Sequence, residues 1–413
     1  MMRCGLLGRT LGHSYSPAIH KTLGGAYTYE LFEVEPENLP GFLARKDWDG
    51  LNVTIPYKQA VIPFCQSLSP DASAIGSVNT ILRRADDSHC GDNTDARGFL
   101  YMLQGLGVWV TGKKVLVLGS GGSSRTVCHV LREGSVGEVI VISREGTHTY
   151  ETLDRHTDAQ ILVNTTPVGM YPETGKAPVD LARFPRLEAV LDLIYNPART
   201  CLLQDAEARG IPHIGGLPML VGQAAAAASI FSGKVITAEK ETQALSLIRR
   251  QMENLIFVGM PGSGKSTIGQ LAAAHMGRPF VDADQAIEEA AGYTIPEIFA
   301  REGEAGFRCR ETKILETLGR QSGLVIATGG GAVTRPENYP HLHQNGVILW
   351  LERDLAALAR EGRPLSQSAD LQAMYQARRP YYQRFADRTV QNAGAPEAVA
   401  QTALEVFMKH LGH

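Results

Sequence analysis

The chain has 413 residues, which is too long for a single hydrophobic core, so two or three domains are expected. Hydrophobic residues make up 44% of it and charged residues 20%, as is ordinary for a soluble globular protein, and a formal net charge of -3 argues against nucleic acid or membrane as a partner. The six cysteines form no Cys-x-x-Cys pair, which argues against a zinc site and favours a reducing, cytoplasmic compartment. The N-terminus lacks an apolar signal core, and no stretch reaches the roughly 20 apolar residues of a membrane span.

Short apolar runs alternate with helical patterns along the whole chain, which predicts an α/β fold with parallel sheets. In the first part of the chain, strands are expected at residues 4–8, 114–118, 139–142, 161–163 and 189–193. A polar helical stretch at 238–251 is expected to close this part, and its alternating charges predict a solvated helix. A second series of strands is expected at 255–258, 279–281, 324–327 and 347–351.

Polar clusters occupy residues 12–17, 52–58, 77–80 and 91–95. Amide and hydroxyl groups at strand ends suit a small polyhydroxylated ligand, and Lys58 with Asp95 has the chemistry of a proton-transfer pair beside a carbonyl or alcohol. From spacing alone, surface loops rich in turn-forming residues explain the clusters better.

A glycine-rich loop, Gly-Ser-Gly-Gly-Ser-Ser-Arg at 119–125, follows the apolar run 115–118. This layout is typical of a dinucleotide loop, although Ser124 takes the third small position and a glycine turn that binds nothing is the alternative. The next strand ends at Ser143 and Arg144 without the carboxylate usual in an NAD site. A guanidinium there suits a 2′-phosphate, so NADP is preferred, while the nearby Glu145 keeps NAD open.

A second glycine loop, Gly-Met-Pro-Gly-Ser-Gly-Lys-Ser-Thr at 259–267, follows an apolar run and precedes a helical pattern. This is the layout of a P-loop, whose backbone N–H groups surround a phosphate. Lys265 can reach the β and γ phosphates, and Ser266 can ligate Mg²⁺. Asp282 and Asp284 point the same way from the following strand, which suits Mg²⁺ and a substrate hydroxyl; a capped turn is the alternative.

The clusters before residue 250 resemble, in order, the motifs of shikimate dehydrogenases. They include Ser-x-Ser at 14–16, Asn-Val-Thr-x-Pro-x-Lys at 52–58, Val-Asn-Thr at 78–80, Gly-Asp-Asn-Thr-Asp at 91–95, the loop at 119–125, and further segments at 164–170, 192–197 and 216–224. The resemblance implies a dehydrogenase over 1–250, with a catalytic lobe of 1–99 and 223–250 and a Rossmann NADP-binding lobe of 100–222. It implies the reversible, NADPH-dependent reduction of 3-dehydroshikimate to shikimate.

This resemblance also implies roles for individual residues. Ser14 and Ser16 would hold the substrate carboxylate, and Lys58 would be the acid/base candidate oriented by Asp95, although which of the two moves the proton stays open. The ring oxygens would be held by Asn52, Thr54, Asn79, Asp95 and Gln223, with Tyr195 nearby. The NADP contacts would be Gly119, Gly121, Gly122, Ser123, Ser124, Arg125, Ser143, Arg144, Leu193, Gly216 and Met219. His13 and His20 are expected to be structural, because hydride transfer with a Lys–Asp pair needs no imidazole.

Residues 251–413 resemble shikimate kinase, a P-loop enzyme with a parallel sheet that phosphorylates shikimate to shikimate 3-phosphate with ATP. Shikimate would be held by Asp284, Arg308, Gly329, Gly330, Gly331 and Arg378, and Mg²⁺ by Ser266 and Asp282. The ATP contacts would be Gly262, Ser263, Gly264, Lys265, Ser266, Thr267 and the lid residue Arg363. Asp284 would orient the attacking hydroxyl, while Lys265, Mg²⁺ and Arg363 neutralise charge. The lid segment at 360–365 is several residues shorter than the family pattern, which makes Arg360 less suited to stack on adenine.

The sequence therefore predicts a cytoplasmic bifunctional enzyme of aromatic amino acid (chorismate) biosynthesis that uses NADP, ATP and Mg²⁺, with no signal for oligomeric state. One alternative is an NAD-linked quinate or shikimate dehydrogenase fused to a related small-molecule kinase. Another is a regulatory sensor that binds both ligands without turnover. The presence of Lys58, Asp95, Lys265 and Asp284 argues against the sensor.

Overall fold

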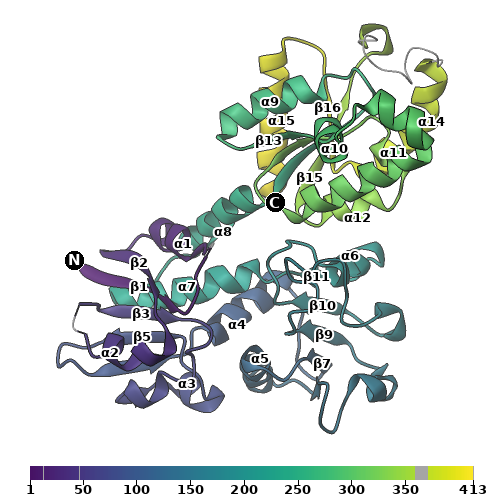
Figure 1. The fold of residues 1–413 in the computed structure, drawn as a ribbon. Helices are drawn as coiled ribbons and strands as arrows, with labels where there is room; N and C mark the ends of the chain where they lie inside the picture. Colours follow the sequence, from purple (N-terminus) through teal and green to yellow (C-terminus); the bar gives the residue numbers. More distant parts are fainter. Residues whose placement is uncertain (13, 46, 359–370, 413) are drawn as a thin grey trace. The chain divides into compact units, whose positions relative to one another are not determined.

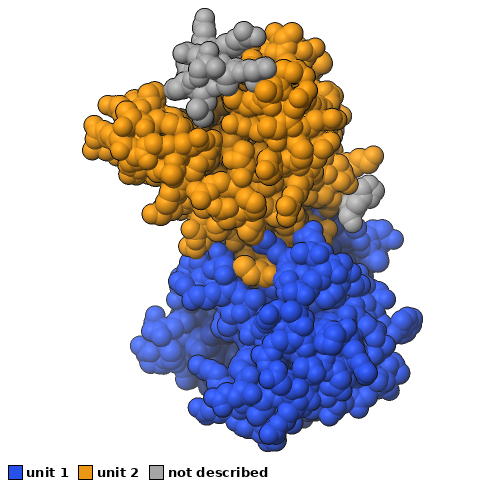
Figure 2. All heavy atoms as spheres, turned by 90° about the vertical axis from the view of Figure 1, so that its right-hand side faces the viewer, with its two compact units in different colours: residues 1–195, 202–248 blue, residues 196–201, 249–413 orange. Residues whose placement is uncertain are grey.

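In the computed structural model, the chain is described except for residues 13, 46, 359–370 and 413, and it divides into two compact units (Figures 1 and 2). The first unit consists of Met1–Tyr195 and Leu202–Ile248, and the second of Asn196–Cys201 and Arg249–His413. Within the described residues, none of the helices has the length and apolar character needed to cross a membrane.

The first unit begins with a six-stranded sheet in the order β2-β1-β3-β5-β6-β4. Its elements are β1 (Met2–Gly8), α1 (Ser16–Leu23), β2 (Tyr27–Glu33), α2 (Leu39–Leu43), β3 (Gly50–Val53), β4 (Ser67–Leu68), α3 (Pro70–Ile75), β5 (Thr80–Arg83) and β6 (His89–Asp92). Strand β1 pairs in parallel with β2 and β3, whereas β5 is antiparallel to both β3 and β6. The sheet is therefore mixed, with antiparallel pairs at β5 beside the parallel pairs that the alternation of strands and helices predicts.

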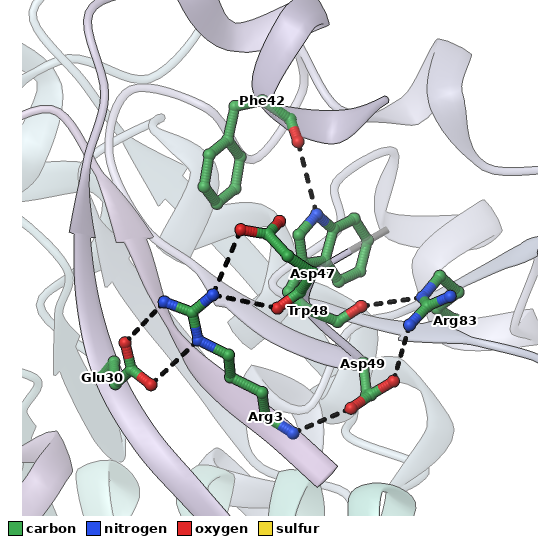
Figure 3. A network of polar contacts seen from close by, with 7 residues as sticks. All are labelled: Arg3, Glu30, Phe42, Asp47, Trp48, Asp49 and Arg83. Carbon is green, nitrogen blue, oxygen red and sulfur yellow. Dashed lines mark hydrogen bonds and ion pairs between the residues drawn. The ribbon is translucent and has the colours of Figure 1, made fainter. Parts of the chain in front are cut away.

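A polar network joins the strands of this sheet at one edge (Figure 3). The Arg3 guanidinium on β1 donates to both carboxylate oxygens of Glu30 on β2, at 2.9 and 2.8 Å. The Arg3 backbone N–H and the Arg83 guanidinium on β5 share the two oxygens of Asp49, at 2.8 and 2.7 Å. Because the Arg3 and Glu30 side chains are 39% and 43% exposed, solvent screens this pair and it contributes little to stability, so the network serves mainly to fix strand register.

The second sheet of this unit is fully parallel, in the order β11-β10-β9-β7-β8. Its strands are β7 (Lys114–Leu118), β8 (Glu138–Ile142), β9 (Ile161–Asn164), β10 (Ala189–Asp192) and β11 (His213–Ile214). Helices α4 (Asp95–Leu106) and α5 (Gly122–Glu133) pack on one face, and α6 (Cys201–Ala208) packs on the other. Strand β7 lies between β8 and β9, so the chain adds strands first to one side of β7 and then to the other. The glycine loop after β7 therefore lies at the point where the strand order reverses, which is where parallel sheets of this kind bind ligands.

Helices α4 and α7 (Leu217–Ser232) join the two sheets of the first unit (Figure 1). They approach closely, because a Cβ on Gly98 of α4 would stand only 2.5 Å from the Met219 carbonyl oxygen of α7. At its other end α7 packs Ala227 and Phe231 against Cys4 of β1. One helix therefore contacts both lobes, which positions its residues at the cleft between them.

Helix α8 (Ala238–Met252) differs from its expected character. Ala244 and Ile248, four residues apart, are fully buried, and Lys240 Nζ donates to the Leu23 carbonyl at 2.9 Å. The prediction of a solvated helix was therefore wrong. Its charges lie around a narrow apolar stripe that is buried.

The second unit is a parallel five-stranded sheet in the order β13-β14-β12-β15-β16, covered on both faces. Its strands are β12 (Asn254–Val258), β13 (Phe280–Asp282), β14 (Val325–Ala327), β15 (Gly346–Glu352) and β16 (Arg388–Gln391). Its helices are α9 (Lys265–Met276), α10 (Ala283–Ala291), α11 (Ile295–Arg320), α12 (Asn338–His343), α14 (Leu371–Phe385) and α15 (Pro396–Leu411). Helices α9 and α15 pack on one face, and α11, α12 and α14 on the other (Figure 1). The central strand β12 ends at the P-loop.

Candidate active sites

A cavity of about 300 Å³ in the first unit collects the polar clusters that lie far apart in the sequence. Its walls come from the start of α1, the ends of β3 and β5, and the face of α7. Eight of the nine predicted substrate residues line it, namely Ser14, Ser16, Asn52, Thr54, Lys58, Asn79, Tyr195 and Gln223. The ninth, Asp95, stands behind Lys58. A wall of hydroxyl, amide and ammonium groups suits a small, oxygen-rich ligand.

Lys58 and Asp95 form an ion pair, with 2.5 Å between Lys58 Nζ and Asp95 Oδ2. Asp95 is the first residue of α4, where the positive end of the helix dipole stabilises a carboxylate. The Lys58 side chain is 31% exposed and that of Asp95 only 10%, so the ammonium faces the cavity and the carboxylate orients it from behind. A positioned donor of this kind can pass a proton to or from a ligand oxygen.

Two amide side chains of the cavity are held in fixed orientations. Asn79 Oδ1 accepts the Thr94 backbone N–H at 2.7 Å, and Asn79 Nδ2 donates to Gln223 at 3.3 Å. Asn52 Oδ1 accepts the Tyr29 hydroxyl at 2.8 Å. The amides are therefore preorganised before any ligand arrives, which lowers the entropy cost of binding.

His20 lines the same cavity and is almost completely buried, at 2% exposure. Its Nδ1 atom lies 2.8 Å from the Tyr27 hydroxyl, and its ring stacks on that of Tyr29 at 3.9 Å between centroids. Burial lowers the pKa of His20 to about 3, so the imidazole is neutral. His20 thus supports Tyr29, which in turn bonds Asn52. The sequence did not predict this arrangement, because Tyr29 lies on β2, a strand that the sequence analysis missed.

His20 should make the first unit sensitive to mild acid. In the unfolded chain the pKa of this side chain returns to about 6.5. Between that pH and about 3, His20 therefore binds a proton in the unfolded chain but not in the folded one. Between about pH 6.5 and 3 this residue should therefore cost about 1.4 kcal/mol of folding stability for each unit that the pH falls.

The check is the temperature at which dehydrogenase activity is lost, measured from pH 7.5 to 5 for the wild type and His20→Gln. We expect a flatter pH profile in the variant. Parallel profiles would show that His20 is not the titrating group.

The predicted cofactor residues gather at the ends of β7, β8 and β10. The loop carries Gly119 with φ of 102°, and α5 begins at Gly122, where a Cβ would meet no atom within 4 Å. This open face at a helix N-terminus suits a pyrophosphate. Of the other predicted contacts in this loop, Ser123 and Arg125 are exposed. The Ser124 side chain, at the third small position of the motif, is buried.

Two further segments complete this edge of the sheet. Ser143 and Arg144 follow β8, and the Arg144 side chain is exposed. Leu193 follows β10, and a Cβ on Gly216 would stand 2.0 Å from the Leu193 carbonyl oxygen. Gly216 therefore lets the chain close up before α7, which begins one residue later and carries Met219.

A second cavity, of about 360 Å³, lies at the P-loop of the second unit. Predicted residues that line it are Gly262, Gly264, Lys265, Ser266, Thr267, Asp282, Asp284, Arg308, Gly329, Gly330, Gly331 and Arg378. Ser263 is buried instead, so only its backbone is available to a phosphate. Arg363 and Arg360 lie outside the described residues.

The P-loop has the backbone that phosphate binding requires. Gly262 and Gly264 have φ of 83° and 91°, a region that other residues rarely adopt. Lys265 Nζ donates to the carbonyls of Gly259 and Met260 at 2.9 and 3.0 Å, so its ammonium is held over the loop. The loop thus presents N–H groups and a cation to one anion.

Ser266 Oγ donates to Asp282 Oδ2 at 2.5 Å, beside the loop. Asp282 also accepts the Asp284 backbone N–H at 3.0 Å and so caps α10. Capping was the alternative left open for this carboxylate, and the structure shows that it caps the helix and faces the loop at once. A hydroxyl and a carboxylate oxygen together fit Mg²⁺, which prefers oxygen ligands and keeps several of its waters.

Two arginines, Arg308 and Arg378, also line this cavity, beside acidic residues that include Glu311. Arg308 donates to Glu311 at 2.7 Å, and Arg378 donates to the Gly330 carbonyl at 3.3 Å. Burial raises the pKa of Glu311, and the neighbouring Arg308 opposes that shift. A Cβ on Gly331 would stand 2.2 Å from Arg308, so the glycine turn brings backbone directly against the guanidinium. Two guanidinium groups facing a small cavity fit an anionic acceptor.

Known shikimate dehydrogenases are similar to a little over half of the chain, and the match covers more than nine tenths of their own length. Shikimate dehydrogenases (NADP(+)) of Shouchella clausii and Thermus thermophilus are 35% and 36% identical over 257 and 249 residues, which is 56% of this chain and 92% and 93% of theirs. This chain belongs to the shikimate dehydrogenase family.

Solved structures of the same family match a similar share of the chain. A Thermus thermophilus shikimate 5-dehydrogenase in complex with NADP(H) and shikimate is 35% identical with a TM-score of 0.54, covering 59% of this chain and 98% of that one. A chorismate mutase/shikimate 5-dehydrogenase fusion protein from Clostridium acetobutylicum is 34% identical with a TM-score of 0.56, covering 60% of this chain and 97% of that one.

Family models divide the chain between two enzymes. The model of the shikimate dehydrogenase substrate binding domain matches residues 6–81, and the shikimate kinase model matches residues 261–408. The chain is therefore a fusion in which a shikimate kinase domain follows the shikimate dehydrogenase. The predictions of family and fold are confirmed.

Proposed function

We propose that this chain catalyses two consecutive steps of aromatic amino acid biosynthesis, with the dehydrogenase in residues 1–250 and the kinase in 251–413. The observation that supports it best is the Lys58–Asp95 pair in an oxygen-binding cavity, on the same chain as a P-loop faced by Asp284 and two arginines. The first site reduces 3-dehydroshikimate to shikimate. The second transfers a phosphoryl group from ATP to shikimate and releases shikimate 3-phosphate.

In the dehydrogenase, the Ser14 and Ser16 hydroxyls hold the substrate carboxylate at the start of α1. Asn52, Thr54, Asn79 and Gln223 bond the ring oxygens, and Tyr195 covers the ligand. Lys58 and Asp95, which are in contact, pass a proton to the carbonyl oxygen as it becomes a hydroxyl. NADPH bound along the glycine loop supplies the hydride for this reduction.

Arg144 should decide the choice between NADPH and NADH. It is the exposed cation at the tip of β8, where a ribose 2′-phosphate would lie. Losing an arginine–phosphate contact costs about 1.5–3 kcal/mol, or about one to two powers of ten in affinity. Arg144→Ala should therefore raise the KM for NADPH by that factor and leave the KM for NADH nearly unchanged. Equal effects on both cofactors would remove Arg144 from the phosphate site.

In the kinase, Arg308, Arg378 and the Gly329–Gly331 turn hold shikimate, and Asp284 orients its attacking hydroxyl. Lys265 and the loop N–H groups bind the transferred phosphate, and Arg363, which lies outside the described residues, keeps the charge-neutralising role that the resemblance implies. Mg²⁺ held by Ser266 and Asp282 would neutralise phosphate charge. Catalysis then rests on positioning and charge neutralisation, since the transition state is largely metaphosphate-like.

The alternative is a dehydrogenase that prefers quinate and NAD. A quinate dehydrogenase from Corynebacterium glutamicum in complex with NAD is 27% identical, with a TM-score of 0.54 over 59% of this chain and 98% of that one. We favour shikimate and NADP because Ser143 and Arg144 leave no carboxylate at the tip of β8. Oxidation rates with shikimate or quinate, each with NADP⁺ or NAD⁺, separate the two. The highest kcat/KM should be that for shikimate with NADP⁺, and a higher value for quinate with NAD⁺ would establish the alternative.

We also propose that the enzyme works in the cytoplasm on small molecules. All six cysteines are free, and two of them, Cys4 and Cys128, are buried. Burial raises the pKa of the Cys4 thiol to about 12 and raises that of Cys128, which keeps both protonated. The proposed reactions draw on NADPH and ATP. Unpaired thiols and these cofactors together suit a reducing compartment.

A further inference from the structure

Two histidines lie against each other beside the loop that carries Arg144, and neither lines the two cavities described above. His156 Nε2 is 3.0 Å from His148 Nδ1, and the ring centroids are 4.8 Å apart with the planes at 71°. His148 lies in the loop that follows β8, and His156 is the last residue of the 3₁₀-helix Tyr150–His156. This histidine pair therefore joins the loop to the element that follows it.

Backbone contacts close the same loop at its base. The Ser143 N–H donates to the His148 carbonyl at 3.1 Å, and Ser143 also pairs with Thr149 in an isolated bridge. Thr149 in turn caps the 3₁₀-helix in a reciprocal capping box with Thr152. Residues 144–147, between these anchors, are all exposed. His148 is thus one end of a short loop whose exposed part begins with the predicted phosphate-binding arginine.

His156 is buried, at 6% exposure, and within the described residues its Nδ1 atom has no hydrogen-bond partner. Burial lowers the pKa of His156, and the neighbouring Lys114 and His148 lower it further. The carboxylates of Glu138 and Asp158 oppose that shift. The imidazole is therefore neutral near pH 7, so it can form a hydrogen bond with His148.

Packing alone does not account for His156. A leucine would fill the same space without burying a nitrogen that lacks a partner, and such a nitrogen costs stability. What the imidazole adds at this position is its contact with His148, which holds the end of the loop.

We propose that His148 and His156 are positioning residues, which hold the loop so that Arg144 meets the 2′-phosphate of NADPH. The proposal rests on the proposed function, in which Arg144 selects NADPH, and assigns the side chains that preorganise this contact. A loop that is already anchored loses less conformational freedom when the cofactor binds, so its affinity is higher. NADH has no 2′-phosphate, so its binding should depend little on the histidine pair.

The test measures binding of NADPH and NADH to the full chain by calorimetry, which needs no turnover. His156→Leu removes the partner of His148 from a buried position and should weaken NADPH binding about 3- to 10-fold, while NADH binding stays within twofold. His148→Leu should have the same effect. His148→Asn should bind NADPH within twofold of the wild type, because the asparagine amide keeps a polar atom near the place of Nδ1.

The matched control is His213→Leu. His213 is a half-buried histidine of β11, at the opposite edge of the same sheet from β8, and it should be replaceable without effect on either cofactor. In the Arg144→Ala background, His156→Leu should weaken NADPH binding no further, because the loop then has no guanidinium to position.

Three results would overturn the positioning role. They are unchanged NADPH binding in His156→Leu, equal losses for NADPH and NADH, and a His148→Asn protein that binds NADPH as weakly as His148→Leu. The last would show that the ring itself contacts the phosphate. Unchanged NADPH binding in Arg144→Ala would overturn the assignment of Arg144, and the positioning role with it. A wild type that binds NADPH but does not reduce 3-dehydroshikimate would overturn the proposed reaction and not the role of the histidine pair.

Discussion

Replacing Lys265 by methionine should lower kcat for shikimate phosphorylation by about 100- to 1,000-fold and leave the dehydrogenase rate unchanged. The ammonium is buried and held over the loop by two carbonyls, and in the proposed mechanism it meets the negative charge that develops during transfer. Removing one preorganised donor from such a site typically costs two to three powers of ten. Methionine keeps the length of the side chain, so the loss measures charge and not volume.

The matched control for Lys265→Met is Lys313→Met, which removes an exposed ammonium from α11 of the same unit. This control should keep both activities. The measurement is ADP release with saturating shikimate, beside shikimate oxidation with NADP⁺ in the same preparation. A kinase rate within threefold of the wild type in Lys265→Met would show that the phosphoryl transfer site lies elsewhere.

Replacing Lys58 by methionine should have the opposite effect. Loss of a positioned acid/base group costs about 100- to 10,000-fold in rate. The ammonium lies 2.5 Å from Asp95 and faces the cavity, so its removal breaks the proposed proton-transfer pair and leaves a largely buried carboxylate without its partner. Dehydrogenation should collapse, while ADP release with supplied shikimate stays near the wild-type rate.

Lys21→Met, on the exposed side of α1, is the control for Lys58→Met and should keep dehydrogenase activity. Asp95→Asn adds information on the pair, because asparagine keeps the shape and removes the charge. If Lys58 moves the proton, Asp95→Asn should retain more activity than Lys58→Met. Loss of both the dehydrogenase and the kinase reactions in a folded Lys58→Met protein would contradict two separate sites.

Most of the strands that the sequence predicted well have buried side chains, although β8 and β13, which lie at sheet edges, were also predicted within one residue. β7, β9, β10, β12 and β15 appear within two residues of their expected bounds, because a parallel strand between two layers of helices must be apolar throughout. β2 and β16, which lie at sheet edges, were missed because neither is apolar throughout. β2 mixes half-buried with exposed side chains, and β16 buries only one of its four side chains. Short antiparallel strands such as β5 and β6 carry too few residues for any period to stand out.

The substrate residues could be predicted because the resemblance supplied them as ordered motifs. What the sequence could not show is how they are held. His20 supports Tyr29 only because β2 lies beside α1. Contacts of this kind come from tertiary pairing, which no local pattern records. The stripe of Ala244 and Ile248 was likewise hidden among the alternating charges of α8.

The most direct test of two consecutive reactions on one chain is a coupled assay on the purified protein. With 3-dehydroshikimate and NADPH alone, reduction should stop at its equilibrium, because shikimate formation is reversible. Adding ATP and Mg²⁺ should draw NADPH consumption to completion, with one ADP released for each NADPH oxidised and shikimate 3-phosphate as the product. If ATP leaves the extent of NADPH oxidation unchanged, or if ADP appears without a matching loss of shikimate, the two sites do not act in sequence.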